Sequence, residues 1–228
     1  MRSQPLVYAL LGPTASGKTA VAEALADALG TEVVSADAMQ VYRELPILTN
    51  QPARPTRLVG IRSLADEMSV GEYAALAHAE IDALLDWTGA AVVAGGTGLY
   101  LRAAVAELDL PPRAAPATRA RWEAAYEHDP AAAYRTLEAL DAAAARLVHP
   151  NDRRRVVRAL ELAASGSSLA PAQPRLWSDA TRRPTLLIGL ELAQAELERR
   201  IRARAEAMFA AGVVEEVRRA LAQHVSRT

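Results

Sequence analysis

Short apolar runs alternate with helical patterns over the first hundred residues. Leu6–Leu11 and Ala90–Ala94 are continuous apolar runs with the length of buried parallel strands, and Glu32–Ser35 is a third β-type run. Between these runs, Thr19–Leu29 and Val70–Leu85 carry apolar residues at helical spacing. The alternation predicts an α/β fold in which helices flank a parallel sheet.

The pattern changes after Leu101. Leu110–Pro116 is rich in proline and indicates a boundary, and Thr118–Ala164 shows only helical patterns, with Asn151 as the expected N-cap of one helix. Ser165–Pro174 has the composition of a linker. We therefore expect a small all-helical insertion at this point in the chain.

The α/β pattern resumes at Thr185–Leu190, which predicts one more strand. A charged amphipathic helix is expected around Glu196–Ala211, and Gly212 separates it from a second helix over Val214–Ala222. The predicted division is a catalytic core of residues 1–112 and 175–228, interrupted by a helical insertion of residues 113–174.

The amino-acid composition excludes several kinds of functional site. The 228 residues include no cysteine, which excludes disulfides, thiolate metal sites and thiol catalysis. No stretch is long enough to span a bilayer, so we expect a soluble cytoplasmic protein. The four histidines show no metal-ligand spacing, and we interpret them as structural or surface groups: His78, His128, His149 and His224.

The formal net charge of −1 gives no reason by itself to expect a polyanionic partner. Arginine is nevertheless concentrated in Arg113–Arg121, Arg153–Arg158 and Arg199–Arg204, and Lys18 is the single lysine. Such local clusters can bind RNA in a neutral protein.

A phosphate-binding loop follows the first predicted strand and opens the first predicted helix. Its glycines let backbone N–H groups turn toward phosphate oxygens, and the helix N-terminus adds positive dipole. The lysine adds a charge, and the threonine hydroxyl can reach a magnesium ion. The motif predicts binding of a di- or triphosphate without saying which. It matches the P-loop pattern in full: Gly12, Pro13, Thr14, Ala15, Ser16, Gly17, Lys18 and Thr19.

Two further segments follow predicted strands at the same edge of the sheet. Asp37 comes after the second strand, where a carboxylate faces the ligand crevice, although an ordinary turn aspartate is an equal alternative. Gly95, Gly96 and Thr97 follow Ala90–Ala94, where small residues let a ligand approach the backbone, although a plain tight turn is an alternative. This strand lacks the magnesium-holding aspartate of many P-loop phosphotransferases, which counts against an ordinary NTPase.

An arginine-rich helix lies in the predicted insertion. Arg154 and Arg158 stand one turn apart, while Val156, Val157 and Leu160 face a core. Guanidinium groups bind phosphate oxygens and stack on bases. On spacing alone, however, a solvated charged face is the simpler interpretation.

Together these segments resemble the bacterial tRNA dimethylallyltransferases, also called isopentenyl-tRNA transferases. The resemblance covers nearly the whole chain and implies a P-loop NTPase-like parallel sheet flanked by helices, with a helical insertion that grips the anticodon stem-loop of tRNA. The matching stretches occur in the family's order: GPTASGKT at 12–19, SADAMQVY at 35–42, GGTGLYLRA at 95–103, HPNDRRRVVRALE at 149–161 and RIRARAEAMFAAGVVEEV at 200–217.

The resemblance also implies a reaction. The P-loop would hold the diphosphate of dimethylallyl diphosphate with Mg²⁺, and the exocyclic amine of the adenine 3′ to the anticodon would attack C1 of the prenyl chain. Asp37 would be the general base, Thr97 would position the amine and the diphosphate, and Lys18 would neutralise charge on the leaving group. Thr19 is the residue implied to face the metal, and the two arginines implied to reach the diphosphate are Arg204 and Arg102.

The same resemblance implies a set of tRNA contacts on both parts of the chain. The expected partners are tRNA and dimethylallyl diphosphate, with no membrane, and we expect a monomer. The residues that match family contacts with tRNA are Asp37, Ala38, Met39, Gln40, Thr97, Arg119, Arg154, Arg155, Val156, Val157 and Arg158.

The chain departs from the family pattern at several points. Ala38 replaces the usual serine after Asp37, and Thr49–Pro52 lacks the lysine of the family's Thr-Ala-Lys-Pro. The stretch Arg57–Ile61 is altered and shorter than in the family. The sequence stops at Thr228, before a Gly-Tyr-containing helix and an Arg/Gln/Trp-rich segment, so we expect a truncated or partly recorded protein.

Three alternatives remain open. A small-molecule kinase of the shikimate or nucleoside type also places an aspartate after its second strand, but it should prefer ATP over a prenyl diphosphate. An adenylate isopentenyltransferase acting on free nucleotides needs no arginine-bearing insertion of this size. An RNA-binding protein without catalysis has no reason to keep Lys18, Thr19, Asp37 and Thr97 together.

Overall fold

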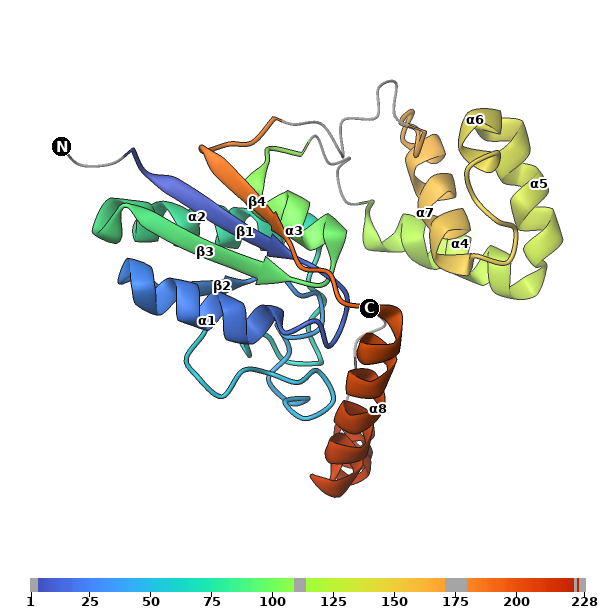
Figure 1. The fold of residues 1–228 in the computed structure, drawn as a ribbon. Helices are drawn as coiled ribbons and strands as arrows, with labels where there is room; N and C mark the ends of the chain where they lie inside the picture. The colour runs from blue at the N-terminus through green and yellow to red at the C-terminus, as the bar shows by residue number, and fades with distance from the viewer. Residues whose placement is uncertain (1–3, 109–113, 171–179, 224, 226–228) are drawn as a thin grey trace. The chain divides into compact units, whose positions relative to one another are not determined.

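A parallel sheet forms the centre of the α/β part of the chain. The structure is a computed structural model that describes residues 4–108, 114–170, 180–223 and 225. Among these residues the strands pair in the order β2-β3-β1-β4 (Figure 1). All four lie where the sequence predicted strands: β1 Leu6–Leu11, β2 Val33–Ser35, β3 Ala90–Gly95 and β4 Thr185–Gly189.

Helices cover both faces of this sheet. Figure 1 shows α1 (Lys18–Leu29) on one face, and α2 (Val70–Thr88) and α3 (Gly98–Val105) on the other. Strand side chains alternate between the faces, so Leu10 packs with α1 while Ala9 joins the core beneath α2 and α3. The crossovers from β1 to β2 and from β2 to β3 therefore use opposite faces, which opens a crevice at the carboxyl ends of β1 and β3.

Helix α3 is an element that the sequence pattern did not predict. We expected only a glycine turn after β3, and the turn is present, but a helix begins at Gly98. Tyr100 and Leu101 bury its inner side, and the Tyr100 ring lies 4.5 Å from that of Tyr73 on α2. A segment of eight residues is too short for its pattern of apolar positions to distinguish a helix from a loop.

The chain divides into two compact units. Unit 1 comprises residues 1–108 and 179–228, and unit 2 comprises residues 109–178. The domain borders expected from the sequence, at 112/113 and 174/175, fall within residues outside the described ranges, as do parts of the predicted proline-rich boundary and linker. Each unit has its own hydrophobic core.

Unit 2 is helical throughout the residues described. Its elements are α4 (Pro116–His128), α5 (Pro130–Leu140), α6 (Ala142–Ala145) and α7 (Arg153–Ala164). One detail of the prediction was wrong: the N-cap of α7 is Asp152, not Asn151. The Asp152 carboxylate accepts a hydrogen bond from the backbone N–H of Arg155 at 3.1 Å, which satisfies a free donor of the first turn.

Two helices follow β4 in unit 1. They are α8 (Gln194–Ala210) and α9 (Val213–Leu221), and they lie where two helices were expected. Gly212 begins α9 at φ +91°, a backbone conformation that glycine adopts without strain, so the predicted interruption is confirmed. None of the seventeen residues of α8 is buried, whereas α9 buries Val213, Glu216 and Ala220.

Gly95 offers a test of how closely the strand ends must approach. An ideal Cβ at Gly95 would lie 2.0 Å from the carbonyl oxygen of Ala36, which is backbone and has little room to move. We therefore expect Gly95→Ala to lower the free energy of unfolding by about 2–3 kcal/mol or more, measured by urea unfolding. The neighbouring Gly96→Ala is the matched control, because its Cβ would meet only the Lys18 Nζ, at 3.9 Å. Equal stability of the two variants would contradict this view of the contact.

Candidate functional site

A cleft of about 330 Å³ opens at the carboxyl ends of the parallel strands in unit 1. The P-loop after β1, the segment after β2 and the glycine turn after β3 all reach it. The structure thus brings together residues that are far apart in the sequence but were predicted to share one site. Its lining comprises Thr14, Ala15, Gly17, Lys18, Thr19, Ala20, Asp37, Gln40, Thr49, Asn50, Ala94, Gly95, Gly96 and Arg204.

The P-loop is held in a bent backbone conformation. Ala15 has φ +65° and Gly17 has φ +93°, and Gly17 leads directly into α1. Gly12 fills a tight position, because an ideal Cβ there would lie 2.8 Å from the Leu190 carbonyl oxygen. The buried Ser16 hydroxyl has no hydrogen-bond partner among the described residues. An anion bound in the loop would accept hydrogen bonds from this hydroxyl and from the backbone N–H groups of the loop.

Lys18 places its ammonium group inside the loop. Its Nζ donates hydrogen bonds to the carbonyl oxygens of Gly12 and Pro13, each at 2.7 Å. Burial lowers the pKa of the Lys18 ammonium; the nearby Asp37 carboxylate raises that pKa and Arg204 lowers it. A partly desolvated cation attracts a phosphate oxygen more strongly than one in water.

Asp37 lines the same cleft as the P-loop. Its Oδ1 accepts a hydrogen bond from the backbone N–H of Met39 at 2.9 Å, which fixes the carboxylate at the start of the turn. Its Oδ2 has no protein donor among the described residues, so it can accept a proton from a bound group. The close packing of Gly95 on Ala36 keeps this turn next to the end of β3.

Arg204 reaches the cleft from α8. Partial burial lowers the pKa of the Arg204 guanidinium, and the Asp37 carboxylate opposes that shift. Sequence analysis did not single out Arg200, one turn earlier on α8. An ideal Cβ at Gly17 would lie 3.7 Å from Arg200 Nη1, so this guanidinium also lies beside the P-loop. Arg200 stands four residues before Arg204, and this helical spacing is the signal in the sequence that could have identified Arg200.

Thr49 and Asn50 form a lip of the cleft that the sequence analysis did not assign. The side chain of Gln40 fixes this lip, because its Nε2 donates to the Thr49 and Asn50 carbonyl oxygens at 3.3 and 3.1 Å. Its Oε1 accepts from the hydroxyl of Ser35 at 2.8 Å. Gln40 was predicted to contact tRNA, and in this structure its amide is committed to the protein.

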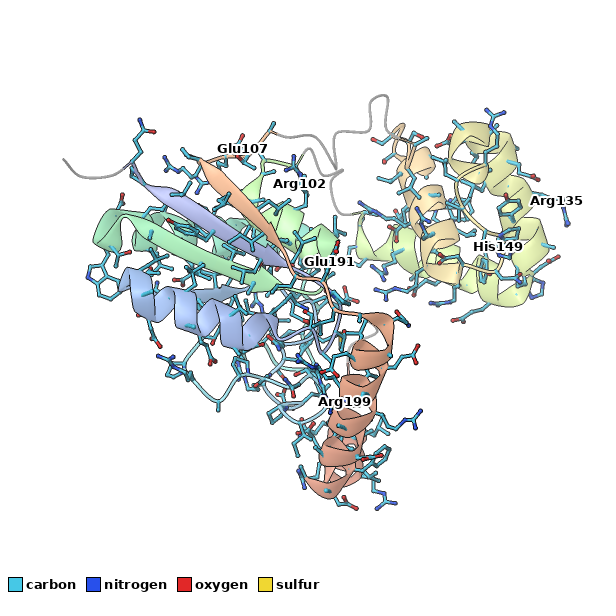
Figure 2. All side chains as sticks on the ribbon, viewed as in Figure 1. Arg102, Glu107, Arg135, His149, Glu191 and Arg199 are labelled. Carbon is cyan, nitrogen blue, oxygen red and sulfur yellow. The ribbon has the colours of Figure 1, made fainter. Side chains whose placement is uncertain are left out.

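Four other predicted residues lie near the cleft or away from it. Thr97 precedes α3 at its N-cap position and is half-buried, directly after the cleft-lining Gly96. Met39 is exposed and Ala38 packs partly against the core. The structure does not place Arg102 at the cleft: its Nη2 donates to the Ala180 carbonyl at 2.7 Å, and Figure 2 shows it on α3. Arg102 therefore does not fit the predicted role in diphosphate binding.

The predicted tRNA-contacting residues of unit 2 fall into three groups. Arg119 and Arg158 pair with carboxylates, at 3.2 Å to Glu123 and 3.0 Å to Glu161. Arg154 and Arg155 are exposed. The side chains of the remaining two residues lie in the hydrophobic core of the unit, so a tRNA contact through them does not fit this burial: Val156 and Val157.

The donor groups at the cleft suit a magnesium ion. Thr19 lines the cleft, and its hydroxyl is the protein oxygen that would face the ion. No group of three or more acidic or histidine side chains that could hold a metal occurs among the described residues. Mg²⁺ needs only one or two protein ligands at such a site, because phosphate oxygens and water complete its octahedral shell.

Comparisons with known proteins agree with this arrangement. The sequence model of the IPP transferase family matches residues 40–228, and that of the isopentenyl transferase family matches residues 5–65. The tRNA dimethylallyltransferase of Anaeromyxobacter sp. (strain K) is 44% identical over 215 residues, covering 91% of this chain and 70% of that protein. That of Symbiobacterium thermophilum is 39% identical over 229 residues, covering 96% and 71%.

Solved structures give the same family. The crystal structure of a tRNA isopentenylpyrophosphate transferase from Bacillus halodurans is 30% identical with a TM-score of 0.64, covering 98% of this chain and 72% of that one. A eukaryotic dimethylallyltransferase acting on tRNA is 26% identical with a TM-score of 0.74, covering 95% and 56%. These matches do not favour the kinase and free-nucleotide alternatives. The chain belongs to the IPP transferase family, together with the tRNA dimethylallyltransferases that it matches.

Proposed function

We propose that this chain transfers a dimethylallyl group from dimethylallyl diphosphate to N6 of the adenine 3′ to the anticodon of a tRNA. The observation that carries this proposal is that two cations, Lys18 and Arg204, meet the Asp37 carboxylate in one cleft. A diphosphate leaving group needs the cations, which neutralise its charge. An amine nucleophile that loses a proton needs the carboxylate, which accepts that proton.

The diphosphate sits against the P-loop, where backbone N–H groups at the start of α1 point toward its oxygens. Lys18 exchanges its bonds with the Gly12 and Pro13 carbonyls for stronger bonds to phosphate oxygen. Arg204 approaches from α8, so cations lie on two sides of the leaving group. A bound magnesium ion, held by Thr19 and the diphosphate, would supply further neutralisation of the charge that develops.

Asp37 acts on the nucleophile. The adenine N6 forms a bond to C1 of the prenyl chain while the bond from C1 to the diphosphate oxygen breaks. The proton that N6 loses goes to the Asp37 carboxylate, and the diphosphate carries away the negative charge. In this proposal Thr97, which follows the glycine turn, holds the amine. The base must leave its stack to reach the cleft, as bases do in other nucleobase-modifying enzymes.

Unit 2 supplies the grip on tRNA. The exposed Arg154 and Arg155 at the first turn of α7 bind phosphate oxygens of the anticodon stem-loop. Arg119 and Arg158 are held in place by Glu123 and Glu161 and present oriented guanidinium groups.

The protein acts as a monomer in the cytoplasm, where its substrate tRNA is found. No helix among the described residues is long and apolar enough to cross a bilayer.

The direct test incubates the protein with labelled dimethylallyl diphosphate, magnesium, and either a tRNA with adenine 3′ to the anticodon or free AMP. Label in tRNA is the expected outcome. Label in AMP alone would move the function to free-nucleotide prenylation. Absence of label from both acceptors, in a preparation that binds diphosphate, would contradict the proposed transfer.

Lys18→Ala is expected to weaken binding of inorganic diphosphate about 10- to 100-fold, the value of one charge-assisted hydrogen bond. Burial keeps the pKa of Lys18 below the 10.5 of an exposed lysine. The ammonium therefore loses its proton, and the protein loses affinity, at a lower pH than an exposed lysine would. Calorimetric titrations across an alkaline pH series measure both effects. Any pH dependence that persists in Lys18→Ala comes from the diphosphate and from other groups of the protein, and identical pH profiles for the two proteins would exclude the effect of Lys18.

Asp37→Ala is expected to lower kcat for transfer to tRNA by about 100-fold or more, since general-base catalysis contributes this much. Affinity for inorganic diphosphate should stay the same or rise, because the variant removes a negative charge near Lys18 and Arg204. Single-turnover transfer and calorimetry separate the two quantities. Near-normal turnover in the variant would show that Asp37 is not the base.

Arg154→Ala is expected to weaken tRNA binding and to reduce the slope of log K against log salt concentration by about 0.9, the change for one phosphate contact. Arg135→Ala is the control, since Figure 2 shows this arginine on α5, pointing away from the helices of unit 2. Filter binding at several salt concentrations measures both slopes. If the two variants weaken binding equally, α7 has no special part in holding tRNA.

A further inference from the structure

Helix α8 carries cations to the cleft, but it contributes no fully buried side chain that would fix them there. Arg204 lines the cleft and Arg200 lies beside Gly17 of the P-loop. None of the seventeen residues of α8 is buried, and its ion pairs with Glu196 lie within the helix itself. A helix without a buried stripe takes its position from the elements attached to it.

Helix α9 provides the attachment. It follows α8 after Gly212, contacts α8, and buries Val213, Glu216 and Ala220. Ala220 joins the main hydrophobic core of unit 1. Glu216 is 3% exposed, which is unusual for a carboxylate and requires partners.

The partners of Glu216 are two consecutive backbone N–H groups. Ile47 N donates to Oε2 at 2.9 Å and Leu48 N donates to Oε1 at 2.8 Å. These groups begin a turn in which Thr49 N bonds to the Leu45 carbonyl, so they have no acceptor within the turn itself, as at a helix N-terminus. One carboxylate thus ties α9 to a loop 168 and 169 residues earlier in the chain.

The bonded turn is also the lip of the cleft. Thr49 and Asn50 follow directly after Leu48, and both line the cleft together with Lys18 and Asp37. Gln40 bonds their carbonyl oxygens from the other side. The Glu216 contact therefore sets two walls at once: the lip made by the turn and the α8 wall that holds Arg204.

We infer that Glu216 is a positioning residue for the proposed prenyl transfer, which holds Arg204 and the Thr49–Asn50 lip at the spacing that a diphosphate requires. This inference rests on the proposed function for its ligand, but the anchoring itself is a property of the protein alone. Glu216 touches no reacting atom; it acts through Arg204 and the lip.

The carboxylate is specific for this task. It offers an acceptor to each of the two N–H donors, whereas an amide of the same shape offers one acceptor and turns its own N–H₂ toward the second donor. Glu216→Gln therefore keeps the volume and breaks one of the two bonds. Glu215→Gln is the matched control, because it removes the same charge from the same turn of α9 but its side chain is 59% exposed and pairs with Arg218.

The first measurement is amide hydrogen exchange without ligand. In Glu216→Gln we expect faster exchange at Ile47 and Leu48 and throughout α8, with the amides of α1 unchanged; in Glu215→Gln all three segments should match the parent protein. Unchanged exchange in α8 of Glu216→Gln would overturn the anchoring step, whatever the ligand of the cleft is.

The second measurement is calorimetric titration with inorganic diphosphate of the parent chain, Glu216→Gln, Glu215→Gln, Arg204→Ala and the double variant Arg204→Ala/Glu216→Gln. We expect Glu216→Gln to bind about tenfold more weakly and Glu215→Gln to bind like the parent chain. In the double variant Glu216→Gln should add little to the loss caused by Arg204→Ala, because the two changes remove the same interaction. A general loss of stability would add fully in the double variant, and that additivity would overturn the proposal.

Two further outcomes separate this inference from the proposed function. A parent chain that binds no diphosphate would contradict the proposed function, and the exchange measurement would still decide the anchoring. Should Glu216→Gln be unfolded at the assay temperature, exchange in the parent chain replaces it: diphosphate should then slow exchange in residues 45–51 and in α9 together. Protection confined to the P-loop would overturn the inference.

Discussion

The cleft depends on how closely the segment after β2 can approach the end of β3. At Gly95 the chain leaves no space for a side chain, since a Cβ would lie 2.0 Å from the Ala36 carbonyl oxygen. Only a glycine lets these two backbones meet, and the meeting brings Asp37 to the same edge of the sheet as the P-loop. Parallel pairing of β1 with β3 completes the arrangement, because it puts all three carboxyl ends on one side. The chemistry of the site therefore follows from a contact between main-chain atoms.

Charge at this edge is divided between two walls. Lys18 belongs to the P-loop and Arg204 to α8, and burial lowers the pKa of both while the Asp37 carboxylate opposes that effect. Desolvated cations with one carboxylate between them are suited to a small, highly charged anion whose reaction partner gives up a proton.

The two arginine-rich regions of the chain are used differently. In unit 2, Arg119, Arg153 and Arg158 are paired with glutamates, which explains how a protein of net charge −1 presents a small cationic surface at Arg154 and Arg155. On α8, Arg200 lies beside the P-loop and Arg204 lines the cleft, and their placement depends on α9 and its buried Glu216. In both regions a carboxylate sets the position of a guanidinium. The glutamates therefore orient the arginines as well as balance their charge.

The sequence by itself determined the four strands, the P-loop, the helical insertion and the interruption at Gly212, because each of these rests on local periodicity or on a glycine at a required backbone conformation. It also brought Asp37 and Gly95 to one edge, since parallel strands share a carboxyl end. Only the tertiary structure decided that Arg102 bonds to Ala180 away from the cleft, that Val156 and Val157 are core residues, and that Gln40 holds the lip. Those outcomes depend on neighbours contributed by distant segments. Glu216 is the clearest case, because the partners of its buried carboxylate are two N–H groups that lie 168 and 169 residues away in the chain.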